Sequence, residues 1–337
     1  MTAAGAQPAR RRFSEALGLA AGLAVSLLAL VAVFAWSGWG RLGAALAAAD
    51  YRWVVLGAIL YLVSLVVRAA CWRTLLSRSV PLGRVLATLT EGYLINNLLP
   101  WRLGEVGRAL LLGRQPGMSP SRVLSSIVGE RVLDVTMGLL LLAFLWPLLV
   151  GEVWAGRIAA VAGGALAVTL GIVVLTAARS DWIERLIKLL PGGAARWGRV
   201  WEGWRSGIRA LTEPRTALVA FAWMALGWAI AGAEFWAVLR AFQPTAPAPW
   251  ALASLAIIAF GGALPSAPAS VGVFEFAAAA ALAPFGVEPG TAVAYALVVH
   301  AVNAGLSTAL GALALSGEGE TLIGILRAAR GWIRSAP

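Results

Sequence analysis

Long apolar runs separated by short basic segments dominate the pattern of this chain. Six of these runs are long enough to cross a bilayer, whose hydrocarbon core requires about 20 apolar residues in a helix. They cover residues 13–36, 53–76, 123–150, 158–178, 217–239 and 293–315. The pattern therefore predicts an all-α polytopic membrane protein with about six full spans.

Two further regions, 82–113 and 250–285, do not have the pattern of single spans. Each contains two apolar stretches around a turn rich in proline or glycine, and stretches shorter than about 17 residues are more typical of re-entrant segments. Pro100 and Pro265 are expected to end helices, because proline lacks an amide donor and clashes with the preceding turn. We expect two re-entrant helical hairpins.

Charge supports a membrane location. Only 13% of the residues are charged, whereas an ordinary soluble protein has about 25%. The net charge of +11 suits cytoplasmic loops beside an anionic leaflet better than nucleic acid. If both hairpins return to the side they entered, most arginines fall on one side. The positive-inside rule then predicts a multi-pass protein of the inner (cytoplasmic) membrane with both termini in the cytoplasm.

The two halves of the chain share one order of elements: a span, an interrupted pair and a span. This order predicts an inverted repeat, a common plan for secondary transporters, although coincidence in a chain rich in alanine and leucine is the alternative. We expect a single integral-membrane domain with an N-half, a cytoplasmic linker, a C-half and a basic tail, at 1–178, 179–215, 216–315 and 316–337. Within the linker, residues 182–211 have the periodicity of an amphipathic interfacial helix, and the alternative is a simple connection between the two halves.

Charged residues inside apolar regions are costly, so they normally pair or face a cavity. Around Pro100, Arg102 and Arg108 flank a predicted helix start, where a phosphate is favoured by the helix terminus and by the guanidinium fork. Glu105 is expected to orient an arginine, and Asn96 and Asn97 to satisfy exposed backbone groups. The alternative is that the two arginines only follow the positive-inside rule.

A second cluster, Glu130, Arg131 and Asp134, has the spacing of neighbours on one helix. Further along, Glu275 is expected to pair with Arg131 or Arg68, or to be protonated in an apolar setting. The alternative for these charges is that buried pairing only holds the bundle together. His300 and Asn303, one turn apart, are interpreted as polar contacts between packed helices, with a proton relay as the alternative.

Three motifs occur in order along the chain: NNLLPWRLGEVGR at 96–108, ERVLD at 130–134 and PSAPASVGVFE at 265–275. Together they resemble the lysylphosphatidylglycerol synthase transmembrane, or flippase-like, family. One departure is Ala269 and Ser270, where glycines are expected. Full synthases of the family also carry a soluble aminoacyl-transfer domain. None follows here before Pro337, so the resemblance implies a stand-alone, flippase-like function without lipid aminoacylation.

These observations favour a lipid flippase or lipid-headgroup transporter acting on an anionic lipid of the phospholipid or polyprenyl-phosphate type. The expected substrate-binding residues are Asn96, Asn97, Pro100, Arg102, Arg108 and Arg131. The expected charge-switch or pairing residues are Glu105, Glu130, Asp134 and Glu275. The expected hinge residues are Gly104, Pro265, Pro268 and Gly272.

Two alternatives stay open. The first is an integral-membrane glycosyl- or lipid-transferase, but the chain has no Asp-x-Asp, HExxH or P-loop motif and only one histidine, so we expect no catalytic residue, metal or cofactor. The second is a non-transporting membrane subunit for lipid or glycan biosynthesis, packed through alanine- and glycine-rich spans. The expected partners are membrane lipids with an anionic headgroup, with a lipid or glycan synthesis enzyme as a further candidate and no nucleic acid.

Overall fold

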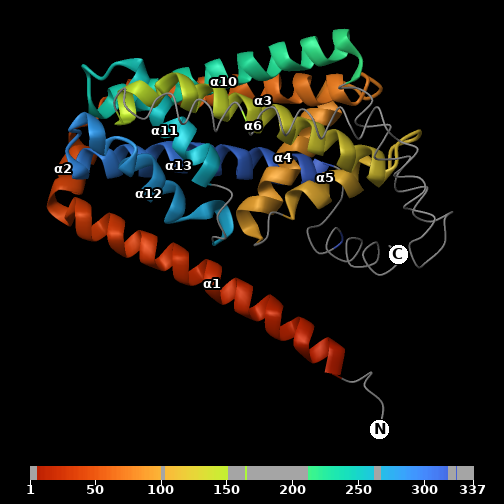
Figure 1. The fold of residues 1–337 in the computed structure, drawn as a ribbon, viewed down its shortest axis with the longest axis horizontal. Helices are drawn as coiled ribbons and strands as arrows, with labels where there is room; N and C mark the ends of the chain where they lie inside the picture. The colour runs from red at the N-terminus through yellow and green to blue at the C-terminus, as the bar shows by residue number, and fades with distance from the viewer. Residues whose placement is uncertain are drawn as a thin grey trace. The chain divides into compact units, whose positions relative to one another are not determined.

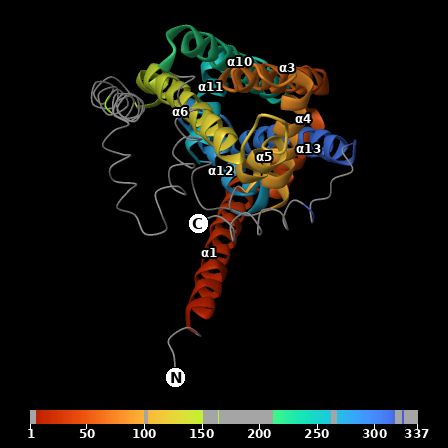
Figure 2. The same cartoon turned by 90° about the vertical axis from the view of Figure 1, so that its right-hand side faces the viewer.

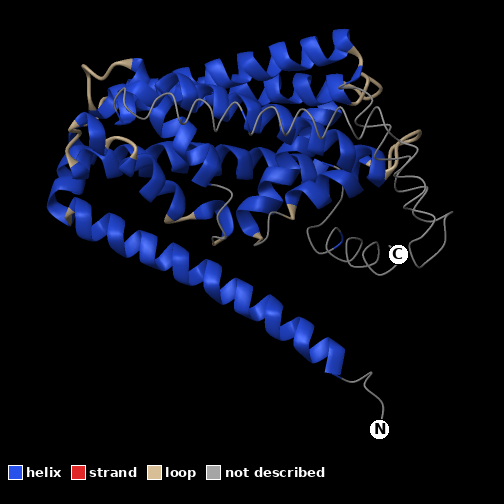
Figure 3. Ribbon diagram, viewed as in Figure 1, coloured by secondary structure: helices blue, strands red, loops and turns tan. Residues whose placement is uncertain are grey.

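The computed structural model describes residues 6–99, 103–150, 212–261 and 267–317, together with Gly164 and Gly324. Within these ranges the chain is helical, with connecting turns and no strand (Figure 3). The prediction of an all-α protein is therefore confirmed for the part of the chain that the structure describes. Pro100, Arg102 and Pro265 lie outside it, as do the expected span at 158–178 and the expected interfacial helix at 182–211.

Ten α-helices, which Figure 1 labels, and two 3₁₀ turns follow one another along the described residues. The long helices are α1 Ala6–Ser37, α3 Tyr51–Leu75, α6 Pro120–Val150, α10 Pro214–Phe242 and α13 Pro289–Gly317. The shorter helices are α2 Trp39–Ala48, α4 Leu82–Leu98, α5 Gly104–Leu112, α11 Ala248–Gly261 and α12 Val273–Ala280, with the 3₁₀ turns η3 Pro268–Ser270 and η4 Ala283–Phe285. Each described long helix coincides with one of the apolar runs in the sequence, although the run at 53–76 extends one residue beyond α3.

Among the described residues, four segments are long and apolar enough to cross a membrane: α3, α10, α13 and Pro268–Phe285. A bent pair, α1 with α2, raises the number to five if the pair is one span. The six spans and the inverted repeat stay predictions.

The bend between α1 and α2 is 78°. It occurs at Gly38, whose φ of 71° suits a residue without a side chain. The apolar pattern predicts a first helix that ends near residue 36, and it gives no sign of α2.

Both interrupted regions consist of two helices around a break, as predicted. In the first, α4 and α5 are separated at residues 99–103. In the second, α11 is followed by η3 and by α12, which has eight residues. At 1.5 Å per residue, α12 spans only about 12 Å, well short of a bilayer core of about 30 Å. Although Pro268–Phe285 is long enough as a whole, regular α-helix makes up less than half of it.

The chain divides into two compact units. Unit 1 contains Met1–Ala58, Asn96–Arg102 and Glu234–Ala304, and unit 2 contains Ile59–Ile95, Leu103–Ala233 and Gly305–Pro337. In unit 1, α12 packs against α1 and α11, around a core rich in alanine that includes the fully buried Tyr295. In unit 2, α5 packs against α6 (Figure 2), and Trp72 is the largest residue of the core.

Candidate functional site

Five charged side chains of unit 2 form one connected cluster, which we call the charge network. Its members are Arg68 of α3, Arg108 of α5, and Glu130, Arg131 and Asp134 of α6. The ERVLD motif supplies three of them from one face of α6, as its spacing predicts. The other two are arginines from neighbouring helices, so tertiary packing completes the network.

The inner end of the network is a closed ion pair. The Nη2 atom of Arg108 lies 2.6 Å from Oε2 of Glu130, and the two side chains are only 2% and 1% exposed. The guanidinium of Arg108 also lies over the Trp72 ring, 3.8 Å from its centroid. Its aliphatic stem occupies the space that a Cβ at Gly92 would need. Arg108 is therefore held on three sides.

The outer end of the network is partly open. Arg131 lies 3.0 Å from Asp134 through Nη1 and 3.6 Å from Glu130 through Nη2, and its side chain is 35% exposed. Asp134 also lies 3.6 Å from Arg68 and accepts a 2.9 Å hydrogen bond from Nε1 of Trp228. Asp134 is therefore held by ion pairs with Arg131 and Arg68 and by a hydrogen bond from Trp228, so it keeps two of these partners if one is withdrawn.

The network has a formal charge of +1, because three arginines face two carboxylates. Arginine does not lose its proton in proteins, so this positive charge is permanent. A cation at membrane depth attracts anions, and the guanidinium fork matches phosphate geometry. The open end at Arg131 is the place where an anion could exchange with Asp134. In the part of the chain that the structure describes, no group of three or more His, Cys, Asp or Glu side chains could hold a metal ion.

The remaining predicted residues of the first cluster lie elsewhere. Asn96 and Asn97 are half-buried near the end of α4, and Nδ2 of Asn97 donates to the carbonyl of Ala304 at 3.3 Å. Gly104 begins α5, and Glu105 in its first turn is half-buried. None of the ion pairs that join the network includes Glu105.

A second buried centre lies in unit 1, and we call it the Glu275–His300 pair. Oε1 of Glu275 lies 2.6 Å from Nδ1 of His300, and Oε2 accepts a 2.6 Å hydrogen bond from the backbone N–H of Gly272. Nε2 of His300 lies 2.9 Å from the carbonyl oxygen of Ala269. Phe274 stacks on the imidazole at 4.3 Å between ring centroids. The partner of Glu275 is thus His300 rather than the expected Arg131 or Arg68, and His300 makes a polar contact between α12 and α13.

These contacts fix how many protons the pair holds. A carbonyl oxygen only accepts hydrogen bonds, so Nε2 of His300 carries a hydrogen. The short contact at Nδ1 then needs one more proton, either on the imidazole or on the carboxyl group. In both arrangements the pair is neutral overall. Removal of that proton would set a carboxylate against a nitrogen lone pair and break the contact.

The turn before α12 has an unusual backbone. Ala269 and Ser270 have φ values of 57° and 60°, and Gly272 has 87°. Only glycine adopts this left-handed region without cost, which is the physical reason that glycines are expected at 269 and 270. The turn is fixed to α1, because the N–H of Ala267 donates to Oγ of Ser26 at 2.8 Å and a Cβ at Gly272 would meet the Ser26 carbonyl.

Two of the predicted hinge residues, Pro268 and Gly272, lie in this turn. Pro268 opens η3, where its fixed φ is compatible with a helical start. Gly272 supplies both a positive φ and the donor that holds Glu275. The geometry is consistent with a fixed turn, and movement of the predicted hinge stays a prediction.

Long apolar helices, two broken helix pairs and buried ion pairs define a multi-pass integral membrane protein. Residues 19–311 match the family described as the lysylphosphatidylglycerol synthase TM region, so the chain belongs to that family. A UPF0104 membrane protein of Methanothermobacter thermautotrophicus is 26% identical over 312 residues, which cover 86% of this chain and 90% of that protein. A UPF0104 membrane protein of Pyrococcus horikoshii is 27% identical over 148 residues, or 42% of this chain and 43% of that protein.

Proposed function

We propose that the protein is a flippase or headgroup transporter for an anionic membrane lipid, of the phospholipid or polyprenyl-phosphate type. The observation that carries this proposal is the charge network, whose permanent excess of one positive charge has a partly open end at Arg131. Membership of the family supports a membrane function. The proposed location is the inner (cytoplasmic) membrane, with both termini in the cytoplasm.

The chemistry of the proposed step is an exchange of ion-pair partners. A lipid phosphate approaches Arg131 and replaces Asp134 as its partner. Asp134 keeps the Trp228 N–H and the Arg68 guanidinium as donors, so its charge stays compensated. Arg108 and Glu130 remain paired behind them and act as the fixed anchor of the site.

Liposomes that contain the purified full chain test the proposal. Phosphatidylglycerol with a fluorophore on its headgroup or acyl chain is added to both leaflets, and a reductant that cannot cross the bilayer bleaches the outer one. We expect faster loss of the protected signal than in empty vesicles. The Arg131→Gln variant should slow the excess rate by roughly tenfold, the effect of about 1.4 kcal/mol.

The matched control is Arg122→Gln, which removes the same charge from the first turn of the same helix, where Arg122 is half-buried. It should leave the rate unchanged. No acceleration above empty vesicles would reject the proposal. Acceleration only after addition of a lipid or glycan synthase would favour the non-transporting subunit, and product formed from a lipid-linked sugar would favour the transferase.

A further inference from the structure

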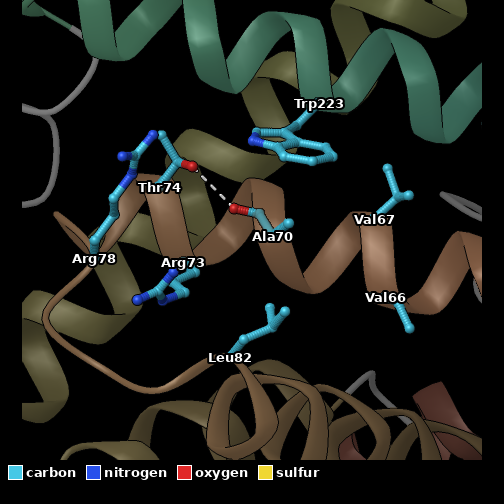
Figure 4. A pocket seen from close by; sticks show the side chains of 8 residues that line it. All are labelled: Val66, Val67, Ala70, Arg73, Thr74, Arg78, Leu82 and Trp223. Carbon is cyan, nitrogen blue, oxygen red and sulfur yellow. Dashed lines mark hydrogen bonds between the residues drawn. The ribbon is translucent and has the colours of Figure 1, made fainter.

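A groove of about 300 Å³ lies on unit 2 between α3, α10 and the start of α4 (Figure 4). Its wall is apolar and is formed by Val66, Val67, Ala70, Leu82 and Trp223. Arg73, Thr74 and Arg78 lie at one end of it (Figure 4). The Thr74 hydroxyl is occupied, since it donates to the Ala70 carbonyl at 2.9 Å. The groove is therefore amphipathic, with cations at one end only.

A second hollow of about 340 Å³ continues from that basic end. Thr74 and Arg78 line both hollows, and the second adds Arg215 and Glu213. Glu213 accepts a hydrogen bond from Oγ1 of Thr216 at 2.8 Å. Across the described residues, no carboxylate pairs with Arg73, Arg78 or Arg215, so three guanidinium groups meet one acidic side chain there.

The turn at the end of α3 determines how two of these arginines, Arg73 and Arg78, are oriented. Arg73 donates through Nε to the carbonyl of Val80 at 2.8 Å, which fixes the plane of its guanidinium. Ser77 and Arg78 have φ values of 58° and 55°, and the N–H of Arg78 closes the turn onto the Arg73 carbonyl at 2.8 Å. This tight turn brings Arg78 back beside Thr74. An anion at this end would meet guanidinium groups from two directions.

The groove is separate from the charge network. At about 100° per residue, Arg68 and Trp72 lie on the opposite side of α3 from Val66, Ala70 and Arg73. A ligand in the groove therefore cannot touch the network through α3. Lipid binding in the groove therefore does not depend on transport through the charge network.

We infer that this groove binds one anionic phospholipid, which stays bound and is not the transported molecule. The phosphate lies on Arg73, Arg78 and Arg215, which offer charge-assisted and bidentate hydrogen bonds. The upper part of one acyl chain lies along Val66, Val67 and Trp223. The shape and the charge of the groove together favour an anionic lipid over the other ligands. A free phosphate would leave the apolar wall exposed, and a neutral lipid would leave the arginines without a counter-charge.

Native mass spectrometry of the full chain in detergent provides the test. The protein is titrated with dioleoylphosphatidylglycerol or with dioleoylphosphatidylcholine, and the fraction that carries one lipid is measured. We expect one tight adduct with phosphatidylglycerol and weaker, non-saturating binding of phosphatidylcholine. The double variant Arg78→Gln/Arg215→Gln should weaken the first adduct by roughly tenfold or more. The control Arg52→Gln/Arg122→Gln removes two arginines that do not line the groove, one exposed and one half-buried, and it should not weaken the adduct.

A second pair of variants tests the apolar wall. Val66 and Val63 are both on α3 and are 42% and 44% exposed, but only Val66 lines the groove. Val66→Trp should reduce the tight adduct, and Val63→Trp should leave it unchanged. Equal affinity for the two lipids, no effect of either groove variant, or complete displacement by millimolar inorganic phosphate would overturn the inference. Since only equilibrium binding is measured, a failure of transport in liposomes would leave these results standing.

Discussion

The charge network of unit 2 and the Glu275–His300 pair of unit 1 solve the same problem in different ways. Both hold a buried carboxylate inside apolar helices, where an isolated charge would be very costly. The network compensates two carboxylates with three arginines and keeps a permanent excess of positive charge. The pair is neutral overall, with one proton between Oε1 of Glu275 and Nδ1 of His300. The first arrangement leaves a net positive charge among the helices, and the second leaves none.

The largest expected effect comes from the inner end of the network. Arg108→Met leaves the buried Glu130 carboxylate with only its longer, 3.6 Å contact to Arg131, so the free energy of unfolding should fall by about 3–5 kcal/mol. The double variant Arg108→Met/Glu130→Leu replaces the pair by apolar groups and should recover most of that loss. Denaturant unfolding in detergent micelles measures both. If the double variant is as unstable as the single one, the buried pair is not the cause.

The same measurement on the Glu275–His300 pair should give a smaller loss. Glu275→Ala removes the acceptor for both Gly272 and His300, at a cost of about 1–3 kcal/mol for an unsatisfied buried group. Glu275→Gln keeps one carbonyl acceptor and should cost less than Glu275→Ala. Equal losses for the two variants would contradict the contacts that we describe.

The turn that carries Ala269 offers a gain in stability rather than a loss. Its left-handed φ costs an L-residue about 1–2 kcal/mol, while glycine loses about 0.5–1 kcal/mol of chain entropy on folding. Ala269→Gly should therefore stabilise unit 1 by up to about 1 kcal/mol. The matched control, Ala277→Gly within α12, should destabilise it by about 1 kcal/mol. A loss at both positions would show that the turn is not strained at residue 269.

The exposed ion pair between Arg41 and Glu288 provides a reference for the stability that the two buried centres contribute. Arg41 lies 3.5 Å from Glu288, which precedes α13. Although desolvation opposes the shift, hydrogen bonds from Gly290 and Thr291 and the charge of Arg41 lower the pKa of Glu288. A carboxylate with a lowered folded-state pKa stabilises the protein above its unfolded pKa of about 4.3, and this contribution is lost as the pH falls through the folded-state pKa.

Glu288→Gln should therefore cost less than about 1 kcal/mol at pH 7, as is usual for exposed pairs. The difference from the wild type should vanish at low pH. Unfolding titrations at several pH values measure it. A cost as large as that of Arg108→Met would remove the distinction between exposed and buried pairs in this protein.

Much of the helical framework could be predicted because apolar runs directly report burial in lipid or core. The run at 53–76 differs from α3 by two residues at its start and by one at its end. The breaks in the two interrupted regions lie where the turn-rich segments predict. The bend at Gly38 could not be predicted from the apolar pattern. Both α1 and α2 are apolar, and hydropathy does not show where the axis of a helix changes direction. Local pairing within ERVLD was also predictable, because i, i+3 neighbours meet on any helix.

Partners from other helices could not be predicted in this way. Arg68 has no acidic neighbour in its own run, and its partner Asp134 lies 66 positions further along the chain. His300 is a lone histidine on an apolar helix, which more often indicates packing than pairing with a residue 25 positions away. The signal for His300 was indirect, since Glu275 lacks a nearby arginine and needs another donor.

Gly92 has a consequence for engineering a more robust variant. Exchange of glycine for alanine in helices commonly raises stability by about 0.4–1 kcal/mol, and Gly40 and Gly83 have open space for the added methyl group. At Gly92 the methyl group would collide with the stem of Arg108. A routine stabilising exchange would there displace the cation that neutralises Glu130, so a consensus design should leave this position alone.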